Sequence, residues 1–375
     1  MKNSKKMLRI FAILMTTISL FAMGTRADDG MQKSLQKLAG EASKGYIDPI
    51  TQGLLTNFNG GLFHKAPQTK IFGFDFEFGL AVMATPLGNL DREFTSSNLP
   101  FTFNQSQADI IAAGAIVGTG IYYDDLRTSL STALQSSVQT IGISGPTVVG
   151  KKYDPTDPNS EVKISLNGNV TFHLPGGLGD STLNVSQVIG TKLGGIGNLG
   201  EAAAVPFWAP QVTIGTVYGT QFTLRYLPKI ALPDFGDLSW TGFGIQHNIG
   251  MWLPIPFVDV SASFYTQKIK IDPMFELSGT SFGINASKEF GFSFLNVTPY
   301  VGFMIEKANM KVKYTPDAVN FGPGVTPPTI AFDIDGKNTS RLTLGLSVRL
   351  VKFNLNADYN IGKYNSMTAG IFFAL

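Results

Sequence analysis

The chain has 375 residues and contains no cysteine. This absence excludes disulfide scaffolds, thiolate-bound metal sites, thiol catalysis and a lipid-modified cysteine anchor. Charged residues are also scarce at 15% of the chain, whereas an average soluble domain has about 25%. The net charge of +2 argues against a nucleic-acid partner. The three histidines, His64, His173 and His247, lie far apart in the sequence, so we expect neither a metal site nor another cofactor.

Beyond the first 27 residues, long apolar runs are missing as well. Three uncharged windows, 128–150, 202–224 and 238–258, are rich in Ser, Thr and Gln or are interrupted by Pro and Gly. A spanning helix needs about 20 mainly apolar residues, so none of these windows qualifies. The chain is instead rich in phenylalanine, with 29 residues, and in glycine, with 41. This composition suits a protein whose surface does not face water alone.

The N-terminus has the pattern of an export signal. Four basic residues lie between positions 2 and 9, an apolar stretch runs from Ile10 to Met23, and Thr25 and Ala27 are small. The pattern predicts a signal peptide over residues 1–27 that is cleaved after Ala27. The alternative is an uncleaved anchor helix, for which the apolar stretch is short.

A helical period follows the signal. From Met31 to Tyr46, apolar residues recur at spacings of three and four, which predicts one face of a short helix. We interpret residues 28–66 as an N-terminal segment that is either a plug at the mouth of a lumen or a periplasmic cap. A terminal helix packed on a soluble core has the same pattern.

From residue 72 the period becomes two. Six large apolar residues between Phe72 and Val82 alternate with small or acidic ones, as in a strand. The alternation recurs at 258–265, 297–306, 341–350 and 353–361, with weaker examples at 160–174 and 182–189. The clearer runs are long enough to cross a bilayer at a tilt. A sheet in lipid must close, because an open edge would leave backbone groups without hydrogen bonds.

The fold class that we predict is all-β, a transmembrane antiparallel β-barrel over residues 67–375 with a short N-terminal helix. A soluble β-sandwich alternates in the same way, but the long runs and the aromatic residues near their ends, such as Trp208, Trp240 and Trp252, favour a bacterial outer-membrane barrel. The mature length, at about 25 residues per strand and connection, suggests 12–14 strands. Such a lumen is too wide to be filled by strand side chains alone.

The last residues alternate up to the end of the chain, with apolar Phe373 and Leu375 two positions apart. This ending partly matches the C-terminal signal that bacterial barrel-insertion machinery reads, although the last residue there is usually aromatic. We therefore expect two partners, the lipid of the outer membrane and the insertion machinery.

Four segments carry a resemblance to a known family. They read YIDPITQGLLTNFNGG at Tyr46–Gly61, PTVVG at Pro146–Gly150, PFWAPQVTIGTVYGTQFTLRYLP at Pro206–Pro228 and GFGIQHNIGMWLP at Gly242–Pro254. The chain resembles a Bacteroidota family of exported proteins of unknown function with a signal peptide, a short helix and an outer-membrane barrel. In general layout it is also similar to long-chain fatty-acid transporter barrels. The resemblance brings no site residues, and residues 85–140 look like an insertion relative to the family pattern.

The scarce charges on the strands are the best functional candidates. Arg near the bilayer midplane costs about 2–4 kcal/mol on the lipid face, so alternation places these side chains on the inner face. They could pair across the lumen and fill it, or they could line a polar path. Arg225 is the first candidate for such a network, because Leu224 and Tyr226 point the other way. The lumen-facing candidates are Asp75, Glu77, Arg225, Asp259, Glu306, Arg341, Arg349 and Asp358.

Signs of enzymatic chemistry are weak. One Gly-x-Ser-x-Gly match at Gly279–Gly283 is flanked by strand-like sequence on both sides, whereas this motif acts at a strand-to-helix elbow. We expect no catalytic residues and no enzyme. The function that we expect is passive transport of small hydrophobic molecules across the outer membrane, with such a molecule as ligand. The alternative is a non-transporting barrel that serves as a structural or assembly partner.

Overall fold

The computed structural model describes residues 29–196, 202–232, 236–253, 255–292, 294–315 and 329–375. The expected signal peptide, residues 1–27, lies outside the described residues. The chain divides into two compact units. Unit 1 contains residues 1–47, 91–200 and 314–330, and unit 2 contains residues 48–90, 201–313 and 331–375.

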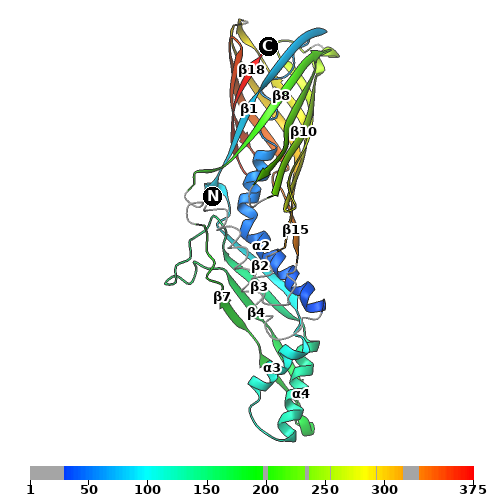
Figure 1. The fold of residues 1–375 in the computed structure, drawn as a ribbon, viewed down its shortest axis with the longest axis vertical. Coiled ribbons are helices and arrows are strands. Elements are labelled where there is room, and N and C mark those ends of the chain that lie inside the picture. Colours follow the sequence, from blue (N-terminus) through cyan, green and yellow to red (C-terminus); the bar gives the residue numbers. More distant parts are fainter. Residues whose placement is uncertain (1–28, 197–201, 233–235, 254, 293, 316–328) are drawn as a thin grey trace. The chain divides into compact units, whose positions relative to one another are not determined.

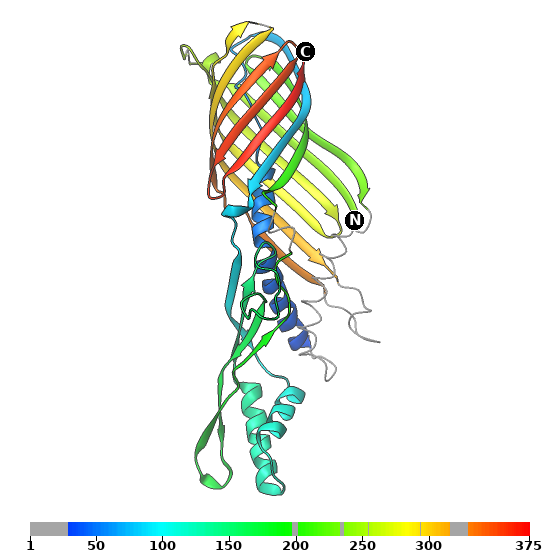
Figure 2. The ribbon, with the colours of Figure 1, turned by 90° about the vertical axis from the view of Figure 1, so that its left-hand side faces the viewer.

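Unit 2 is a closed antiparallel β-barrel (Figures 1 and 2). Ten strands form the ring, which closes because β12 pairs with β14. Two further strands, β13 (Phe290–Phe292) and β15 (Ile330–Asp335), pair with β14. In ring order the strands are β1 (Phe72–Pro86), β8 (Ala204–Val217), β9 (Thr220–Leu232), β10 (Gly236–Asn248), β11 (Asp259–Asp272), β12 (Phe275–Ser287), β14 (Leu295–Tyr314), β16 (Ser340–Leu350), β17 (Phe353–Ile361) and β18 (Ser366–Ala374).

The first and last strands of the ring are neighbours. Phe78 in β1 lies opposite Phe373 in β18 and opposite Val212 in β8. Closure pairs the backbone of every ring strand on both sides, which a sheet in lipid requires.

Along the ring strands, exposed apolar residues alternate with buried polar ones, as in a membrane barrel. In β17, Phe353, Leu355 and Ile361 are exposed, whereas Asn356 and Asp358 between them are buried. The apolar face therefore points outward and the polar face points into the lumen, the reverse of a soluble barrel. A closed antiparallel ring with an even strand number and an apolar exterior is the architecture of an outer-membrane barrel. The predicted fold class is confirmed.

The predicted strand number of 12–14 is wrong for the ring, which has ten strands. The expected barrel range of 67–375 counted residues 91–200, but these residues belong to unit 1. The weak alternation at 160–174 and 182–189 falls within this region, so it does not mark spanning strands.

Unit 1 contains a four-stranded antiparallel sheet in the order β2–β3–β4–β7, the separate hairpin β5–β6, the two short helices α3 and α4, and residues 29–47 of α2 (Asp29–Phe58). Leu130 and Leu134 are buried on one face of α4 (Ile121–Ser136). Unit 1 also has the 3-10 turn η2 (Pro175–Gly177), and unit 2 has the 3-10 turns η1 (Leu87–Asn89) and η3 (Ile249–Met251). The bounds in unit 1 are β2 (Glu93–Phe101), α3 (Gln105–Ala115), α4 (Ile121–Ser136), β3 (Gln139–Pro146), β4 (Lys163–Asn167), β5 (Asn169–His173), β6 (Asp180–Asn184) and β7 (Gln187–Gly190).

Local contacts explain the pair of short helices. Helix α3 begins after Asn104, whose side chain accepts from the backbone N–H of Gln107 while the Gln107 side chain accepts from the Asn104 N–H. Such a capping box satisfies two backbone donors that a helix start leaves open. Arg127 in α4 donates to the carbonyl oxygens of Ile116 and Gly118 and so holds the connection between the helices.

Helix α2 (Asp29–Phe58) has 30 residues and is longer than the predicted Met31–Tyr46. The predicted apolar face is correct where side chains are described, because Leu38, Ala42 and Tyr46 are buried. Its last eleven residues, 48–58, belong to unit 2. Within the described part of the chain, none of the helices is long and apolar enough to cross a membrane.

Candidate functional site in the barrel lumen

Residues 48–70 cross the barrel interior from one end to the other. We name the end with Pro86 and Ala204 the insertion end, because the chain leaves the barrel there toward residues 91–200. We name the end with Phe72 and Leu375 the C-terminal end. Residues 56–70, which follow the path from α2 to β1, are the lumen segment.

At the insertion end, α2 is bound to the barrel wall. The Thr85 hydroxyl donates to the carbonyl oxygen of Gly53 at 3.3 Å and to Oδ1 of Asn57 at 2.8 Å. The Asn57 amide in turn donates to the carbonyl oxygen of Val205 at 2.7 Å. Thr85 and Val205 are partners across the β1–β8 ladder, so these contacts place the last turns of α2 inside this end of the ring.

At the C-terminal end, the lumen segment meets the opposite ends of the strands. The Ala66 backbone N–H donates to the hydroxyl of Ser287 at 2.9 Å, and the Asn248 amide donates to the carbonyl oxygen of Pro67. Ser287 and Asn248 are the last residues of β12 and β10. The segment thus fills the length of the lumen.

Arg225 in β9 caps the end of α2. Its Nη2 donates to the carbonyl oxygens of Gly60 at 2.9 Å and Gly61 at 2.6 Å, and its Nε donates to Oε1 of Gln211 at 3.0 Å. The guanidinium also lies over the Trp240 ring, 5.9 Å from its centre. A helix C-terminus carries unpaired carbonyls and partial negative charge, so a buried cation is well placed there.

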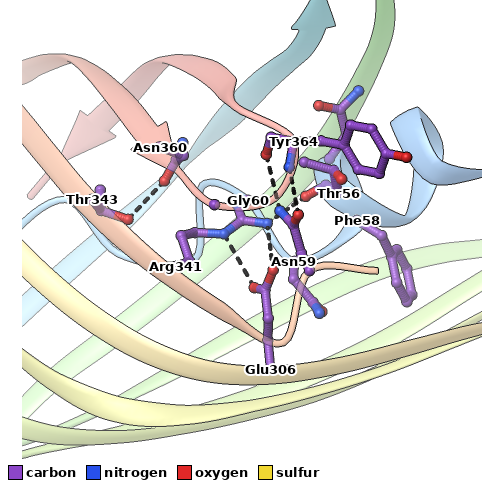
Figure 3. A network of polar contacts seen from close by, with 12 residues as sticks. Thr56, Phe58, Asn59, Gly60, Glu306, Arg341, Thr343, Asn360 and Tyr364 are labelled. Atoms are coloured by element: carbon purple, nitrogen blue, oxygen red, sulfur yellow. Dashed lines mark hydrogen bonds and ion pairs between the residues drawn. The ribbon is translucent and has the colours of Figure 1, made fainter. Parts of the chain in front are cut away.

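Arg341 in β16 makes the second link to α2 (Figure 3). Its Nε and Nη2 donate to the two carboxylate oxygens of Glu306 in β14 at 3.1 and 3.2 Å. Nη2 also donates to the carbonyl oxygen of Thr56. Both charged side chains are buried, and the two-pronged geometry of guanidinium with carboxylate suits a buried pair.

A third cluster joins the lumen segment to β1. His64 Nε2 lies 2.7 Å from Glu77 Oε2, and Lys65 Nζ lies 2.6 Å from Glu77 Oε1 and 3.1 Å from Asp75 Oδ2. Glu77 is fully buried. The His64 ring stacks on Phe372 of β18 with centroids 5.0 Å apart. Two basic side chains of the segment therefore meet two acidic side chains of the wall.

An apolar layer lies between the capped helix end and this charged cluster. Leu62 and Phe63 of the segment form a buried cluster with Tyr265, Tyr300 and Met304 of the wall. The Phe63 and Tyr300 rings pack edge to face at 6.1 Å. Leu62 and Phe63 therefore occupy the lumen at this level, in contact with the wall.

Asp358 lies next to this layer. The Tyr300 hydroxyl donates to Asp358 Oδ2 at 2.8 Å, and the Asn360 amide donates to Oδ1 at 2.7 Å. Wall residues thus supply a hydrogen bond to each oxygen of this carboxylate.

A cavity of about 270 Å³ opens at the C-terminal end, beside the exit of the lumen segment. Charged side chains of both signs line it, among them Lys65, Asp75, Asp259, Glu289 and Arg349. Asp259 accepts from the Asn248 amide at 3.0 Å, and Arg349 donates to the carbonyl oxygen of Val351 at 3.3 Å.

The structure separates the eight predicted residues into two groups. Asp75, Asp259 and Arg349 line the mouth cavity. The other five are buried in the interior, where they belong to several separate polar contacts rather than to one network. Those five are Glu77, Arg225, Glu306, Arg341 and Asp358.

The sequence did not predict which residues of the lumen segment pair with the acidic side chains of the wall. His64 and Lys65 follow α2 where no period marks their direction, yet they lie only 10–13 residues before the acids that they meet. The charge of Lys65 is complementary to that of Asp75 and Glu77, and this was a usable signal. Trp240, expected among interfacial aromatics, instead faces inward and is 3% exposed.

In the part of the chain that the structure describes, Ser281 of the Gly-x-Ser-x-Gly match has no hydrogen bond to a histidine, and His247, the histidine in the strands of the ring, has other partners. His247 accepts from the Trp252 indole at Nε2 and lies 2.9 Å from the Thr220 hydroxyl at Nδ1. Ser281 in β12 is buried opposite Tyr265 and Glu306. The described residues contain no group of His, Asp and Glu that could hold a metal ion.

The sequence can be assigned to a protein family. The profile of a family of unknown function, DUF6588, matches residues 1–375. The chain belongs to this family. A comparison with curated proteins gives no match.

Among solved structures, the chain is similar to outer-membrane barrels. The N-terminal β-barrel domain of Pseudomonas aeruginosa OprF is 17% identical, with 42% of this chain and 94% of that one covered and a TM-score of 0.19. The β domain of the Bordetella autotransporter BrkA is 9% identical, with 81% and 99% covered and a TM-score of 0.23. An OmpT loop-deletion mutant of Vibrio cholerae is 8% identical, with 82% and 100% covered and a TM-score of 0.19. These low scores carry no argument about function.

Proposed function

We propose that this protein is an outer-membrane barrel closed by its own N-terminal segment, which acts as a non-transporting structural or partner barrel. The location rests on the apolar exterior of the ring and on the export signal that the sequence predicts. The observation that carries the proposal is the lumen segment, which is bonded to the wall at both ends and between them.

The energetics favour the closed state. Withdrawal of the segment would leave Glu77 without Lys65 and His64, and would leave Arg225 without the helix end. Loss of one partner of a buried charge pair costs about 3–5 kcal/mol. Water that enters the emptied lumen would offset part of this cost. Several such contacts must break together, so the open state is rare without a trigger.

Transport of small hydrophobic molecules is the second candidate. It is supported by one feature: from Thr56 to Pro67 the segment contacts the wall through hydrogen bonds in which one partner is a side chain, and it is not a ring strand. The segment can therefore leave while the barrel remains closed on itself. The wall that would be uncovered is rich in polar side chains such as Gln211, Thr223 and Gln246, which suits polar better than hydrophobic molecules.

We also propose that the barrel has no enzymatic activity, because the charged lumen groups described above are engaged in pairing. Its expected partners are the lipid around the exterior and the insertion machinery that meets β18. A hydrophobic ligand belongs to the second candidate only.

Conductance of the purified full-length protein in planar bilayers tests the proposal. We expect no steady channel current from the wild type. A stable open current would overturn the closed barrel, and swelling of liposomes by a hydrophobic solute without such a current would favour the second candidate.

A further inference from the structure

The two ends of the barrel differ in the length of their connections. At the C-terminal end, the ring strands are joined by residues 218–219, 249–258, 288–294 and 351–352. At the insertion end, the connections include 87–203 and 315–339, together with the short 233–235, 273–274 and 362–365. The two long connections therefore lie at the same end.

In outer-membrane barrels, short turns face the periplasm and longer loops face the cell exterior. The first ring strand, β1, begins at the C-terminal end, where Phe72 lies beside Val217, and the last ring strand, β18, ends there, where Leu375 donates its N–H to the carbonyl oxygen of Phe76. From these facts we infer that the insertion end faces the cell exterior and that the protein displays residues 91–200 on the cell surface. This inference rests on the proposed outer-membrane location.

The position of residues 91–200 follows from connectivity alone. The chain leaves the ring at Pro86 and returns at Ala204, and these two residues are partners in the β1–β8 ladder. Both attachment points thus lie at one end of one strand pair. Whatever the orientation of unit 1, the residues between those points emerge on that side.

The side of the membrane on which α2 begins can be inferred in the same way. Asp48 pairs with Lys337 at 2.7 Å, and Gln52 donates to the carbonyl oxygen of Asp335 at 2.9 Å, both on the long 315–339 connection. The chain then crosses the lumen and reaches the other end, where Gly219 donates its N–H to the carbonyl oxygen of Lys70 at 3.1 Å. Residues 29–47 of α2 are therefore on the exterior, although they precede the first strand.

The surface is thus reached by two routes. One is the long connection between β1 and β8, and the other is the first part of α2, which precedes the residues that cross the lumen. A periplasmic cap, which the sequence left open for residues 28–66, would require the reverse orientation. The two orientations differ in which residues a reagent outside the cell can reach.

Single-cysteine labelling tests the orientation, because the natural chain contains no cysteine. The variants are Ser186→Cys within residues 91–200, Glu41→Cys in α2 and Lys352→Cys at the C-terminal end. Ser186 and Lys352 are exposed, and Glu41 is half-buried on the same face of α2 as Lys44. Each variant is expressed in Gram-negative cells and treated with a membrane-impermeant maleimide before and after the outer membrane is permeabilised. Labelling of each purified variant in detergent confirms that its thiol is reachable, and heat-modifiable gel migration confirms that it is folded.

We expect labelling at positions 186 and 41 in intact cells and labelling at 352 only after permeabilisation. The reverse pattern would overturn the inference and would mean that residues 91–200 face the periplasm. Labelling at 186 but not at 41 in intact cells would overturn the threaded helix. These outcomes are independent of conductance, so an open channel with the expected labelling would refute the closed barrel and leave the orientation standing.

Discussion

Nη2 of Arg225 lies 2.6 Å from the carbonyl oxygen of Gly61, and this contact ties the middle of strand β9 to the turn that ends α2. A strand side chain thereby terminates a helix that enters the ring from one end. The wall and the segment inside it consequently depend on each other.

Replacement of Arg225 should loosen the lumen segment. Hydrogen bonds to a charged group contribute about 1.5–3 kcal/mol each, so Arg225→Ala should lower the free energy of unfolding by about 3 kcal/mol or more. Urea titration followed by gel migration measures the loss, and bilayer recordings should show brief openings. Arg349→Gln is the matched control, because Arg349 donates to Val351 in its own turn rather than to the lumen segment. Equal effects of both variants would contradict the capping role.

Glu77→Gln should be among the most damaging single changes in the lumen. The variant keeps the shape but removes the buried charge that faces His64 and Lys65, and disruption of such a pair costs about 3–5 kcal/mol. The same urea titration measures the change.

Glu276→Gln is the control for charge alone. Glu276 pairs with Lys268 at 2.8 Å in a half-exposed position, where ion pairs contribute about 0–1 kcal/mol. A control variant as unstable as Glu77→Gln would mean that burial of the Glu77 pair is not the cause.

Gly61→Ala should destabilise the turn after α2. Gly61 has φ of +61°, and an added Cβ would lie 3.0 Å from Thr368 and 3.2 Å from Ala81. The left-handed conformation alone costs about 1–2 kcal/mol for a residue with a Cβ. Gly88→Ala is the matched control, since a Cβ added there would meet no atom within 4 Å and the φ of Gly88 is not in the left-handed region. Stability measurements in which the two variants behave alike would exclude a steric role for Gly61.

High pH should weaken unit 1 through Tyr46. The phenol donates to the carbonyl oxygen of Gly194 at 2.9 Å, and burial raises the pKa of Tyr46 well above its usual value. The unfolded phenol ionises near pH 10 while the folded one stays protonated, so the unfolded state binds fewer protons and stability falls as pH rises. Thermal unfolding of the wild type and of Tyr46→Phe between pH 8 and 11.5 measures this. The wild type should lose more stability than the variant over that range, and parallel curves would refute the assignment.

Much of the barrel was predictable because alternation is a local property of a strand. Residues 353–361 show the pattern in full, with Leu355 outward and Asp358 inward. The wrong strand number came instead from the length of the chain, which included residues 91–200 of unit 1. Ile141 and Ile143 in β3 alternate as well, but they are buried in unit 1, and the pattern cannot distinguish lipid from a protein core.

The lumen charges were predictable one by one, whereas their partners were not. The strand period puts Arg225 and Glu306 on the inner face, but only the folded chain shows that Arg225 meets a helix end and that Glu306 meets Arg341. His64 and Lys65 lie in an irregular segment whose direction no period fixes. Their positions depend on how α2 enters the ring, which is a tertiary property.

The most direct test of the occupied lumen is a disulfide between the lumen segment and the wall. The Ala66 N–H and the Ser287 hydroxyl are 2.9 Å apart, and the chain offers no competing thiol. The pair Ala66→Cys with Ser287→Cys should form a disulfide in the folded, heat-modifiable protein, visible as a faster band without reductant. The control pair, Ala66→Cys with Ser340→Cys, places the second thiol at the opposite end of the ring and should remain reduced. Folded barrels that form no Ala66–Ser287 bond, or that form both bonds equally, would contradict a lumen filled by the N-terminal segment.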